Sequence, residues 1–178
     1  KYISAIQNSL INGGFKGRFY LMKSSGGTVS PNVAKRLPIQ LLESGPAAGA
    51  MAAAYYGKLM GRKNLISFDM GGTTAKACLI DDGVPTVKMV QEAARKHLYK
   101  KGSGILIKTP TIDLIEIGAG GGSIAKVSDL GLMNVGPESA SADPGPVCYK
   151  LGGDQPTVTD ANLLLGYLNP DYFLGGKI

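Results

Sequence analysis

An aspartate, two consecutive glycines and two threonines lie together near the middle of the chain. They are Asp69, Gly71, Gly72, Thr73 and Thr74. Because glycine has no Cβ, a pair of glycines lets backbone N–H groups approach an anion closely. The two threonine hydroxyls add hydrogen-bond donors, and the aspartate carboxylate can hold a Mg²⁺-bound water. These residue types and their spacing predict a phosphate-binding loop, with Asp69 as its metal-site residue.

The segments on both sides of this loop predict strands. An apolar run, residues 65–68, leads into the loop, and a second run, Ala75–Ile80, leaves it. Asp82-Gly83 is a hairpin turn signal, and Val84–Val90 predicts a further strand. A Walker-type loop opens a helix and ends in Gly-Lys-Ser/Thr, so that class of loop is excluded. Residues 65–90 are therefore interpreted as a three-strand phosphate-loop unit.

This strand–loop–strand pattern resembles the phosphate loop of the actin, Hsp70 and sugar-kinase ATPase superfamily. More narrowly, six stretches in order along the chain resemble the hydantoinase A/5-oxoprolinase family. They are SSGGTVS (24–30), ESGPAAGA (43–50), FDMGGTTAK (68–76), EIGAGGGSIA (116–125), VGPESASADPGPVCY (135–149) and PTVTDANLLLG (156–166). A lone GGTT is weak evidence, whereas six ordered motifs within one chain are strong evidence.

The resemblance implies a fold, a reaction and cofactors. The fold is α/β of the ribonuclease-H-like, actin/Hsp70 type, a mixed sheet with flanking helices. The reaction is ATP-dependent ring opening of a cyclic amide such as hydantoin or 5-oxoproline, with phosphate activation of the amide oxygen. ATP and Mg²⁺ are the implied cofactors. Relatives in this family serve in ATP-dependent ketone carboxylation, so the ATP-binding subunit of a ketone carboxylase is the alternative.

One position departs from the commoner form of this family. Lys76 stands where an aspartate often follows the threonines. Its ammonium group either contacts phosphate, as a cofactor-binding residue, or pairs with an acidic side chain. The metal arrangement around Asp69 is left open by this substitution.

A second glycine-rich loop, Gly118–Ser123, follows two acidic residues, Asp113 and Glu116. Its glycines, Gly120, Gly121 and Gly122, either admit a nucleotide or substrate closely, with Ser123 donating a hydrogen bond, or form a packing crossover between strands. We expect the two carboxylates to bind Mg²⁺ or to act as a general base, so both are candidate catalytic residues together with Asp69.

The proline-rich segment 136–156 offers further polar side chains whose role is open. Cys148 as a nucleophile needs a base, and His97, the only histidine, lies in a basic run, so this pair is disfavoured. Asp160 is interpreted as a helix cap rather than a ligand. Cys78 lies in an apolar strand and is predicted to be a buried small hydrophobe.

Composition narrows the class of partner. The net charge is +6, and part of it comes from the run 95–101, for which a solvated surface is favoured over a nucleic-acid patch because the chain shows no recognised nucleic-acid motif. No secretory signal or membrane-length apolar stretch is visible, so we expect a cytoplasmic protein with no nucleic-acid or membrane partner. The expected partners are a small cyclic amide or ketone and a further subunit or lobe.

Helices and strands are also predicted outside the phosphate-loop unit. Helices are expected over residues 2–11, after a Ser44 cap up to Gly61, over 91–101, and from a Thr159 or Asp160 cap to Leu168. Strands are expected over 18–23, 105–108, 112–117, 124–127 and 132–135. The predicted sub-elements are 1–64 (helices and loop), 65–90 (the phosphate-loop unit) and 91–178 (the glycine-rich loop and a substrate-side segment).

The superfamily clamps its nucleotide between two lobes, each with a loop of this kind, and the chain of 178 residues contains one. The resemblance therefore places residues 1–178 in the second phosphate-loop lobe of a longer enzyme, and the chain alone is expected to bind ATP weakly or not at all. Two rival classes stay open, namely a non-catalytic nucleotide-sensing or assembly module and a sugar-kinase-like phosphotransferase.

Overall fold

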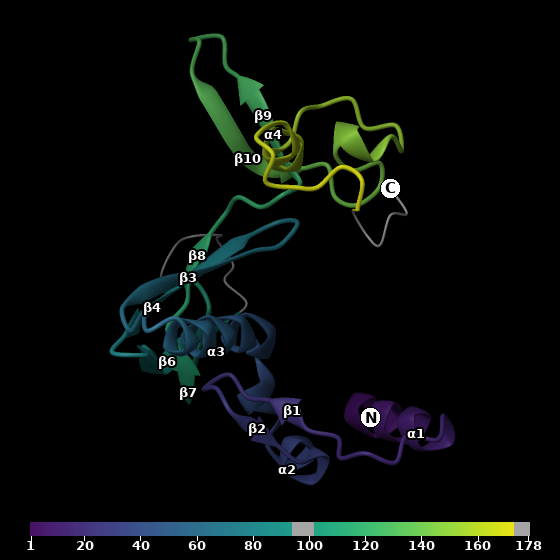
Figure 1. Cartoon of the computed structure of the whole chain (residues 1–178), viewed down its shortest axis with the longest axis vertical. Helices are drawn as coiled ribbons and strands as arrows, with labels where there is room; N and C mark the ends of the chain where they lie inside the picture. Colours follow the sequence, from purple (N-terminus) through teal and green to yellow (C-terminus); the bar gives the residue numbers. More distant parts are fainter. Residues whose placement is uncertain (94–101, 173–178) are drawn as a thin grey trace. The chain divides into compact units, whose positions relative to one another are not determined.

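A computed structural model describes residues 1–93 and 102–172 of this α/β protein (Figure 1). The chain divides into two compact units. The first comprises residues 1–68 and 77–115, and the second comprises residues 69–76 and 116–178. The predicted phosphate loop, residues 69–74, therefore groups with the C-terminal part of the chain, because residues 69–76 make their contacts there. The three sub-elements expected from the sequence (1–64, 65–90 and 91–178) are not tested by this division and stay predictions.

The first unit opens with helices and a short strand pair. Its elements are α1 (Tyr2–Asn12), β1 (Leu21–Met22), β2 (Thr28–Val29), α2 (Pro31–Arg36), the 3₁₀ turn η1 (Pro38–Leu41) and α3 (Ser44–Leu59). The prediction of α1 is confirmed, and its end coincides with the Gly13-Gly14 pair. Strand β1, within the predicted segment 18–23, pairs antiparallel with β2.

Helix α3 packs closely because its inward face is made of small residues. Ala47 and Ala50 are buried and join Cys78 and Ile112 in the core of this unit. At Gly57 an added Cβ would lie 2.5 Å from Leu65 Cδ2, so the helix approaches Leu65 where it has no side chain. Cys78 is fully buried, which confirms its prediction as a small core hydrophobe.

The start of α3 differs from the prediction. Its N-cap is Glu43, which has a left-handed backbone (φ 56°) and makes no side-chain capping bond. The predicted Ser44 hydroxyl cap is wrong because Ser44 is already the first helical residue. Gly61, with φ +67°, follows the helix as expected.

Strands β3 (Leu65–Met70) and β4 (Ala75–Asp81) flank the phosphate loop, as predicted, and β4 pairs with β5 (Val84–Pro85) and with β8 (Ile115–Ile117). Asp82 and Gly83 both have positive φ, the geometry of a tight two-residue hairpin turn. The expected single strand 84–90 is wrong: β6 (Val87–Ala93) pairs with β7 (Ile105–Ile112) in a separate antiparallel sheet.

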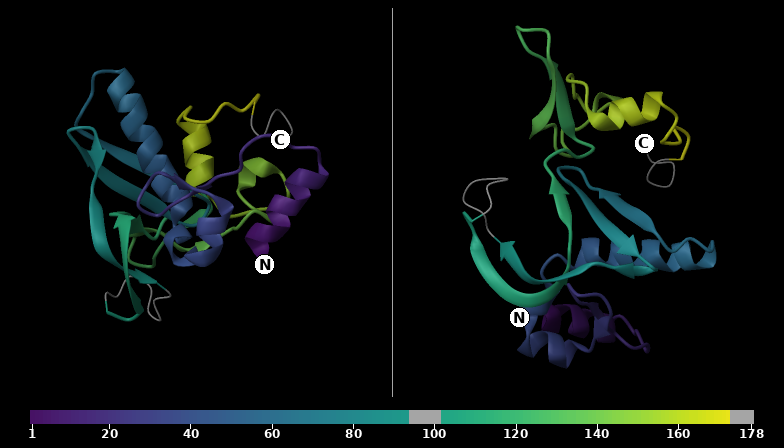
Figure 2. Two further views of the ribbon diagram at one scale, coloured as in Figure 1. Left: turned by 90° about the horizontal axis from the view of Figure 1, so that it is seen from below. Right: turned by 90° about the vertical axis from the view of Figure 1, so that its left-hand side faces the viewer.

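The long β6–β7 pair corrects two further predictions. Residues 91–93 continue β6 instead of starting a helix, and residues 94–101 of that prediction lie outside the described part. Strand β7 runs through Pro110, where a break was expected. The β6–β7 register shifts between Lys88 and Val90, beside this proline, so a residue without an N–H sits at an irregular point of the pairing. The pair curves along its length (Figure 2).

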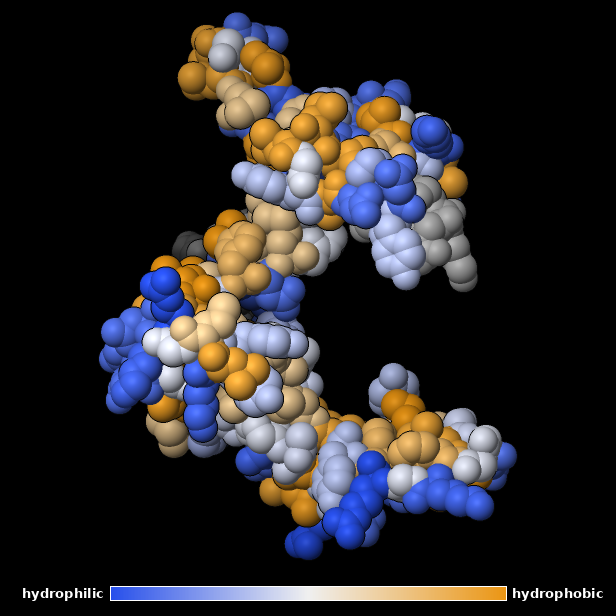
Figure 3. Space-filling view, viewed as in Figure 1, coloured by the Kyte–Doolittle hydropathy of each residue, from blue (hydrophilic) through white to orange (hydrophobic). Residues whose placement is uncertain are grey.

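The second unit contains a hairpin, a 3₁₀ turn and a short helix. The elements are β9 (Ser123–Val127), β10 (Met133–Ser139), η2 (Val147–Tyr149) and α4 (Val158–Leu164). The predicted β9–β10 hairpin is confirmed, and apolar side chains gather on its surface (Figure 3), including the exposed Leu130 and Met133.

Helix α4 begins two or three residues earlier than the expected Thr159 or Asp160 cap, and it ends four residues earlier than expected. Its N-cap is Thr157, whose hydroxyl accepts from Asp160 N, while the Asp160 carboxylate accepts from Thr157 N in a complete capping box. Asp160 is therefore a capping residue at the third helical position, and neither Asp160 nor Thr159 is the N-cap itself.

Candidate phosphate-binding site

The loop between β3 and β4 is a tight, solvent-exposed turn. Gly71 N donates to Thr74 O at 3.0 Å, which closes the turn. Asp69, Gly71, Gly72 and Thr73 are exposed, whereas Ala75, directly after the loop, is fully buried. The candidate ligand-binding residues thus face solvent while the strand that follows them is anchored in the protein.

The second glycine-rich loop lies directly against this turn, backbone to backbone. Gly121 N donates to Gly71 O at 2.9 Å, and Gly122 N donates to Gly72 O at 2.7 Å. These two bonds fix the carbonyl groups of both phosphate-loop glycines. The two segments are about fifty residues apart in sequence, and only the tertiary structure brings them together.

Gly120 is the residue that permits this approach. A Cβ at this position would lie 2.5 Å from Thr73 C, 2.6 Å from Thr73 N and 2.7 Å from Gly71 O. All three are backbone atoms, which cannot rotate away as the end of a side chain can. Any other residue at position 120 would therefore push the two loops apart.

The remaining residues of the second loop are also held by internal contacts. Gly120 N donates to the buried Ser123 Oγ at 2.9 Å, and a Cβ on Gly122 would lie 2.7 Å from Ser139 Oγ. The sequence left two roles open for these glycines, and close packing on the phosphate loop is the one that the contacts display. Their contact with a nucleotide stays a prediction.

Lys76 connects the phosphate loop to the start of the second loop. Its Nζ lies 3.1 Å from Thr74 Oγ1 and 3.3 Å from Glu116 Oε1, and the Lys76 side chain is mostly buried. Of the two roles open for Lys76, pairing with an acid is the one seen. The ammonium group thereby holds the Thr74 hydroxyl in one position and neutralises Glu116.

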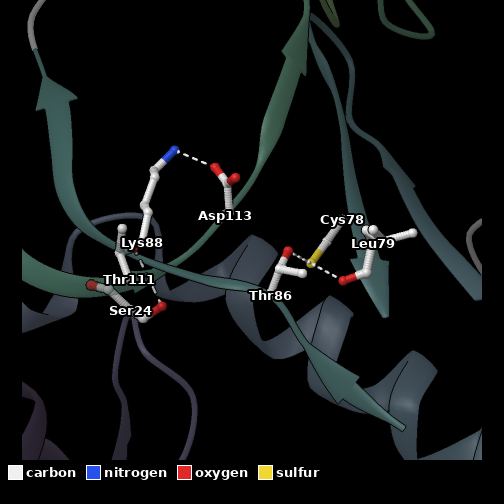
Figure 4. A network of polar contacts seen from close by, with 7 residues as sticks. All are labelled: Ser24, Cys78, Leu79, Thr86, Lys88, Thr111 and Asp113. Atoms are coloured by element: carbon white, nitrogen blue, oxygen red, sulfur yellow. Dashed lines mark hydrogen bonds and ion pairs between the residues drawn. The ribbon is translucent and has the colours of Figure 1, made fainter. Parts of the chain in front are cut away.

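Asp113, the other candidate acid, belongs to the first unit. Its carboxylate pairs with Lys88 Nζ at 2.9 Å (Figure 4), and its N–H donates to Thr86 O. Nearby, Ser24 O accepts from Ile112 N and from the Thr111 hydroxyl, which ties β7 to the loop after β1. The catalytic role expected for Asp113 and Glu116 stays a prediction.

Thr159 is a site-supporting residue that sequence reasoning missed. Its N–H and its hydroxyl both donate to Gly121 O, at 2.8 and 2.9 Å. The first turn of α4 therefore holds the second loop from the side opposite to its contact with Gly71. The signal was present in the stretch PTVTDA, where a capping box identifies the start of a helix, but its neighbour in space could not be read from it.

Asp160 fastens η2 to the start of α4. Its carboxylate accepts from Cys148 N and from Thr157 N and Oγ1, each at 2.8 Å. Burial raises the pKa of Asp160, but the hydrogen bonds from Cys148 and Thr157 outweigh that effect and hold the pKa below its ordinary value. The ionised carboxylate is thus a structural hub of the second unit.

Cys148 has the electrostatics of an inert thiol. Burial, followed by the hydrogen bond to Asp160 and its charge, raises the pKa of the Cys148 thiol from 9.0 to about 11. The thiol is therefore protonated at neutral pH, whereas the thiolate is the nucleophilic form. His97, the base considered for it, lies outside the described residues, as does the rest of the basic run 95–101.

The donor set at the loop fits a magnesium ion shared with a nucleotide. The described residues contain no cluster of three or more His, Cys, Asp or Glu side chains that could hold a metal by themselves. Mg²⁺ usually keeps several waters and binds one or two carboxylates together with substrate phosphates. A single exposed carboxylate, Asp69, beside two threonine hydroxyls matches that mode of binding. In the part of the chain that the structure describes, no helix combines the length and apolarity needed to cross a bilayer.

Comparison with known proteins gives consistent matches along the whole chain. A model of the hydantoinase/oxoprolinase family matches residues 1–178. The acetophenone carboxylase gamma subunit of Aromatoleum aromaticum is 38% identical over 99% of this chain and 23% of its own length. Nucleotide-free acetone carboxylase, an enzyme of ATP-dependent acetone carboxylation, superposes with a TM-score of 0.72 at 34% identity, over 99% of this chain and 23% of that one.

A second solved structure, the ATP-dependent caprolactamase of Pseudomonas jessenii, superposes with a TM-score of 0.68 at 36% identity, over 99% of this chain and 24% of that one. The chain thus spans about a quarter of the length of the relatives it matches.

Proposed function

Because this chain belongs to the hydantoinase/oxoprolinase family, we propose that it forms the phosphate-loop part of an ATP-dependent enzyme that opens a cyclic amide such as hydantoin or 5-oxoproline. The proposed fold is that of the actin/Hsp70 ATPases, ribonuclease-H-like, with residues 1–178 as part of the second phosphate-loop lobe. A cytoplasmic location is part of the same proposal. Both solved relatives are named as ATP-dependent enzymes, and one of them acts on a lactam.

One observation carries the proposal, namely the backbone packing of Gly120 on the phosphate loop. The loop 69–74 is exposed, yet its two glycine carbonyls are fixed by Gly121 and Gly122 from behind. A loop held in one conformation loses little entropy when an anion binds to it. This arrangement supports a preorganised phosphate cradle better than it supports a plain hairpin turn.

The proposed roles follow the chemistry of each side chain. Gly72, Thr73 and Thr74 donate hydrogen bonds to phosphate oxygens, while the N–H of Gly71 closes the turn and so shapes the loop. Asp69 would hold Mg²⁺, which would supply positive charge to the phosphoryl group during its transfer. Lys76 keeps Thr74 in place. Asp113 and Glu116 remain candidates for a general base, and Gly120–Ser123 for a second set of nucleotide contacts.

Phosphate activation explains why an amide hydrolase of this kind needs ATP. The γ-phosphoryl group passes from ATP to the amide oxygen, which releases ADP and converts the amide carbon into a good electrophile. Water then attacks that carbon, and the ring C–N bond breaks as the nitrogen takes up a proton, which leaves an acyl phosphate. A second water hydrolyses the acyl phosphate to the carboxylate and inorganic phosphate. The chain's own contribution is to bind and orient the phosphates, because phosphoryl transfer depends mostly on positioning and charge stabilisation.

A second candidate function is that of the ATP-binding subunit of a ketone carboxylase. The observation in its favour is the 38% identity to a carboxylase subunit over 99% of this chain, with the carboxylase structure superposing at a TM-score of 0.72. Such a function uses the same loop, so the loop geometry does not separate the two candidates. A non-catalytic nucleotide-binding or assembly module is a third.

A substrate screen with the full-length protein and its co-purifying subunits tests the proposal. ATP turnover is measured with hydantoin, 5-oxoproline or caprolactam, and separately with acetone or acetophenone plus bicarbonate. We expect turnover to rise with a cyclic amide and the ring-opened acid to accumulate. Turnover that rises only with ketone and bicarbonate supports the carboxylase instead. ATP binding without turnover on any substrate supports the module, and a phosphorylated sugar product would indicate a kinase.

A further inference from the structure

A groove of about 750 Å³ runs along α3 in the first unit, on elements that the proposed phosphate site does not use. Helix α3 lines one wall with Met51, Ala54 and Tyr55, and β5 contributes Val84 and Pro85 to the other. The walls are therefore mainly apolar. A groove of this size and composition is suited to apolar side chains rather than to water.

The groove also carries positive charge without a matching acid. Lys58, in the last turn of α3, and Arg62, just after it, both line the groove. Lys63 is a third cation, but its Nζ pairs with Asp82 at 3.0 Å. Within the described residues, Lys58 and Arg62 have no acidic partner. The groove thus presents two unpaired cations beside an apolar floor.

Apolar exposure continues on α3 beyond the groove. Tyr56, Leu59 and Met60 are each more than half exposed, at 61%, 64% and 69%. Exposed apolar side chains beside the groove favour a polypeptide occupant, because a small-molecule pocket does not need apolar residues outside its walls. The occupant is therefore expected to be larger than the groove.

From these three features we propose that the α3 groove, defined by Met51, Tyr55, Lys58, Arg62 and Val84, docks an acidic, amphipathic segment of a partner polypeptide. The segment places apolar side chains on the groove walls and carboxylates against Lys58 and Arg62. A second copy docking through the same groove is disfavoured because its Lys58 and Arg62 would meet like charges. Nucleic acid is disfavoured because its interfaces are polar rather than apolar-walled.

This inference rests on the proposed function only for the existence of a partner subunit. It adds the surface where that partner binds and the chemistry of the segment that binds there. Because it concerns docking, it is tested by peptide binding and not by turnover. Absence of ATP turnover on every substrate, with binding of the acidic peptide retained, would refute the enzyme proposal alone.

The experiment uses the full-length protein and a fluorescein-labelled peptide as the probe. The peptide is a helix of about 15 residues with leucines on one face and glutamates at one end, and its twin carries lysines in place of the glutamates. Fluorescence anisotropy measures both dissociation constants. We expect saturable binding of the acidic peptide, about tenfold tighter than that of the lysine twin.

Two variants locate the binding to the groove. The double variant Lys58→Glu/Arg62→Glu is expected to weaken the acidic peptide by about tenfold and to strengthen its lysine twin. The variant Val84→Asn replaces an apolar wall residue by a neutral polar one, at a side chain that is 65% exposed and so tolerant of change, and is expected to weaken both peptides. The matched control is Arg36→Glu/Lys108→Glu, two exposed cations of the same unit outside the groove, with less than about a twofold effect.

Three results would overturn the proposal. The first is no saturable binding of the acidic peptide. The second is equal affinity for the acidic and basic twins. The third is an equal loss in the groove variant and in the control, which would mean that overall charge attracts the peptide. Tight binding of single-stranded DNA that displaces the peptide would assign the groove to nucleic acid instead.

Discussion

The substitution Gly120→Ala tests whether the second glycine-rich loop holds the phosphate loop in place. The added Cβ would lie 2.5 Å from Thr73 C, which is about 1 Å closer than ordinary contact allows. Forcing an extra carbon into close-packed structure costs about 1–3 kcal/mol. Separating the loops also weakens the bonds to Gly71 O and Gly72 O, at about 1 kcal/mol each. The sum is at least about 3 kcal/mol of local stability.

Hydrogen exchange of the full-length protein measures this loss where it occurs. A local free energy lower by about 3 kcal/mol corresponds to roughly 100-fold faster exchange of the amides in residues 69–76 and 118–123. ATP turnover is expected to fall at the same time because the cradle is no longer preorganised. The matched control is Gly45→Ala in the first turn of α3, where a Cβ meets nothing within 4 Å. Exchange in Gly120→Ala that equals the parent's would refute the reasoning, because the two loops would then not depend on each other.

Three further substitutions test separate parts of the site. Gly72→Ala adds a Cβ with nothing within 4 Å, so hydrogen exchange of the loop is expected to stay unchanged. The kcat/KM for ATP is expected to fall about tenfold, because the methyl group occupies the side from which phosphate approaches. Unchanged kinetics would argue against phosphate binding there. Lys76→Met removes the mostly buried ammonium group that holds Thr74 and is expected to lower kcat/KM for ATP about tenfold. The control Lys63→Met removes a lysine from an exposed ion pair and is expected to change kcat/KM less than about twofold. Equal effects of the two variants would refute a positioning role for Lys76. Asp160→Asn is expected to lower the pKa of the Cys148 thiol from about 11, measured by the pH dependence of its alkylation, because the carboxylate charge disfavours the thiolate. In the parent, the stabilisation from ionised Asp160 is complete above its unfolded pKa of about 3.9 and is lost as pH falls through its lower folded pKa. The free energy of unfolding of Asp160→Asn, measured against pH, should therefore lack this loss of stability at acid pH. The same acid dependence in parent and variant would contradict this expectation.

Short-range signals predicted much of the local structure. The phosphate-loop strands, the Asp82-Gly83 turn, α1 and the β9–β10 hairpin all depend on neighbours within a few residues, and all are present. The errors arose where distant pairing outweighs a local signal. Pro110 indicates a strand end, yet β7 passes through it because β6 pairs on both sides of the irregularity.

The candidate site shows the same division. Asp113 and Glu116 are three residues apart in sequence, so they were expected to act together. In the structure the first pairs with Lys88 in one unit and the second with Lys76 in the other. Conversely, Thr159 looked like an ordinary helix start, and its contact with Gly121 gives it a supporting role at the site.

The sequence by itself predicted a phosphate loop, because Asp69, the two glycines and the two threonines are consecutive or nearly so and their residue types are directly visible. It also determined the family, through motifs whose order along the chain is directly visible. Only the tertiary structure decided what the second glycine-rich loop does. Gly120 is needed because the backbone of Thr73 lies where its Cβ would be, and a contact between residues so far apart in the chain leaves no mark on the spacing of either motif.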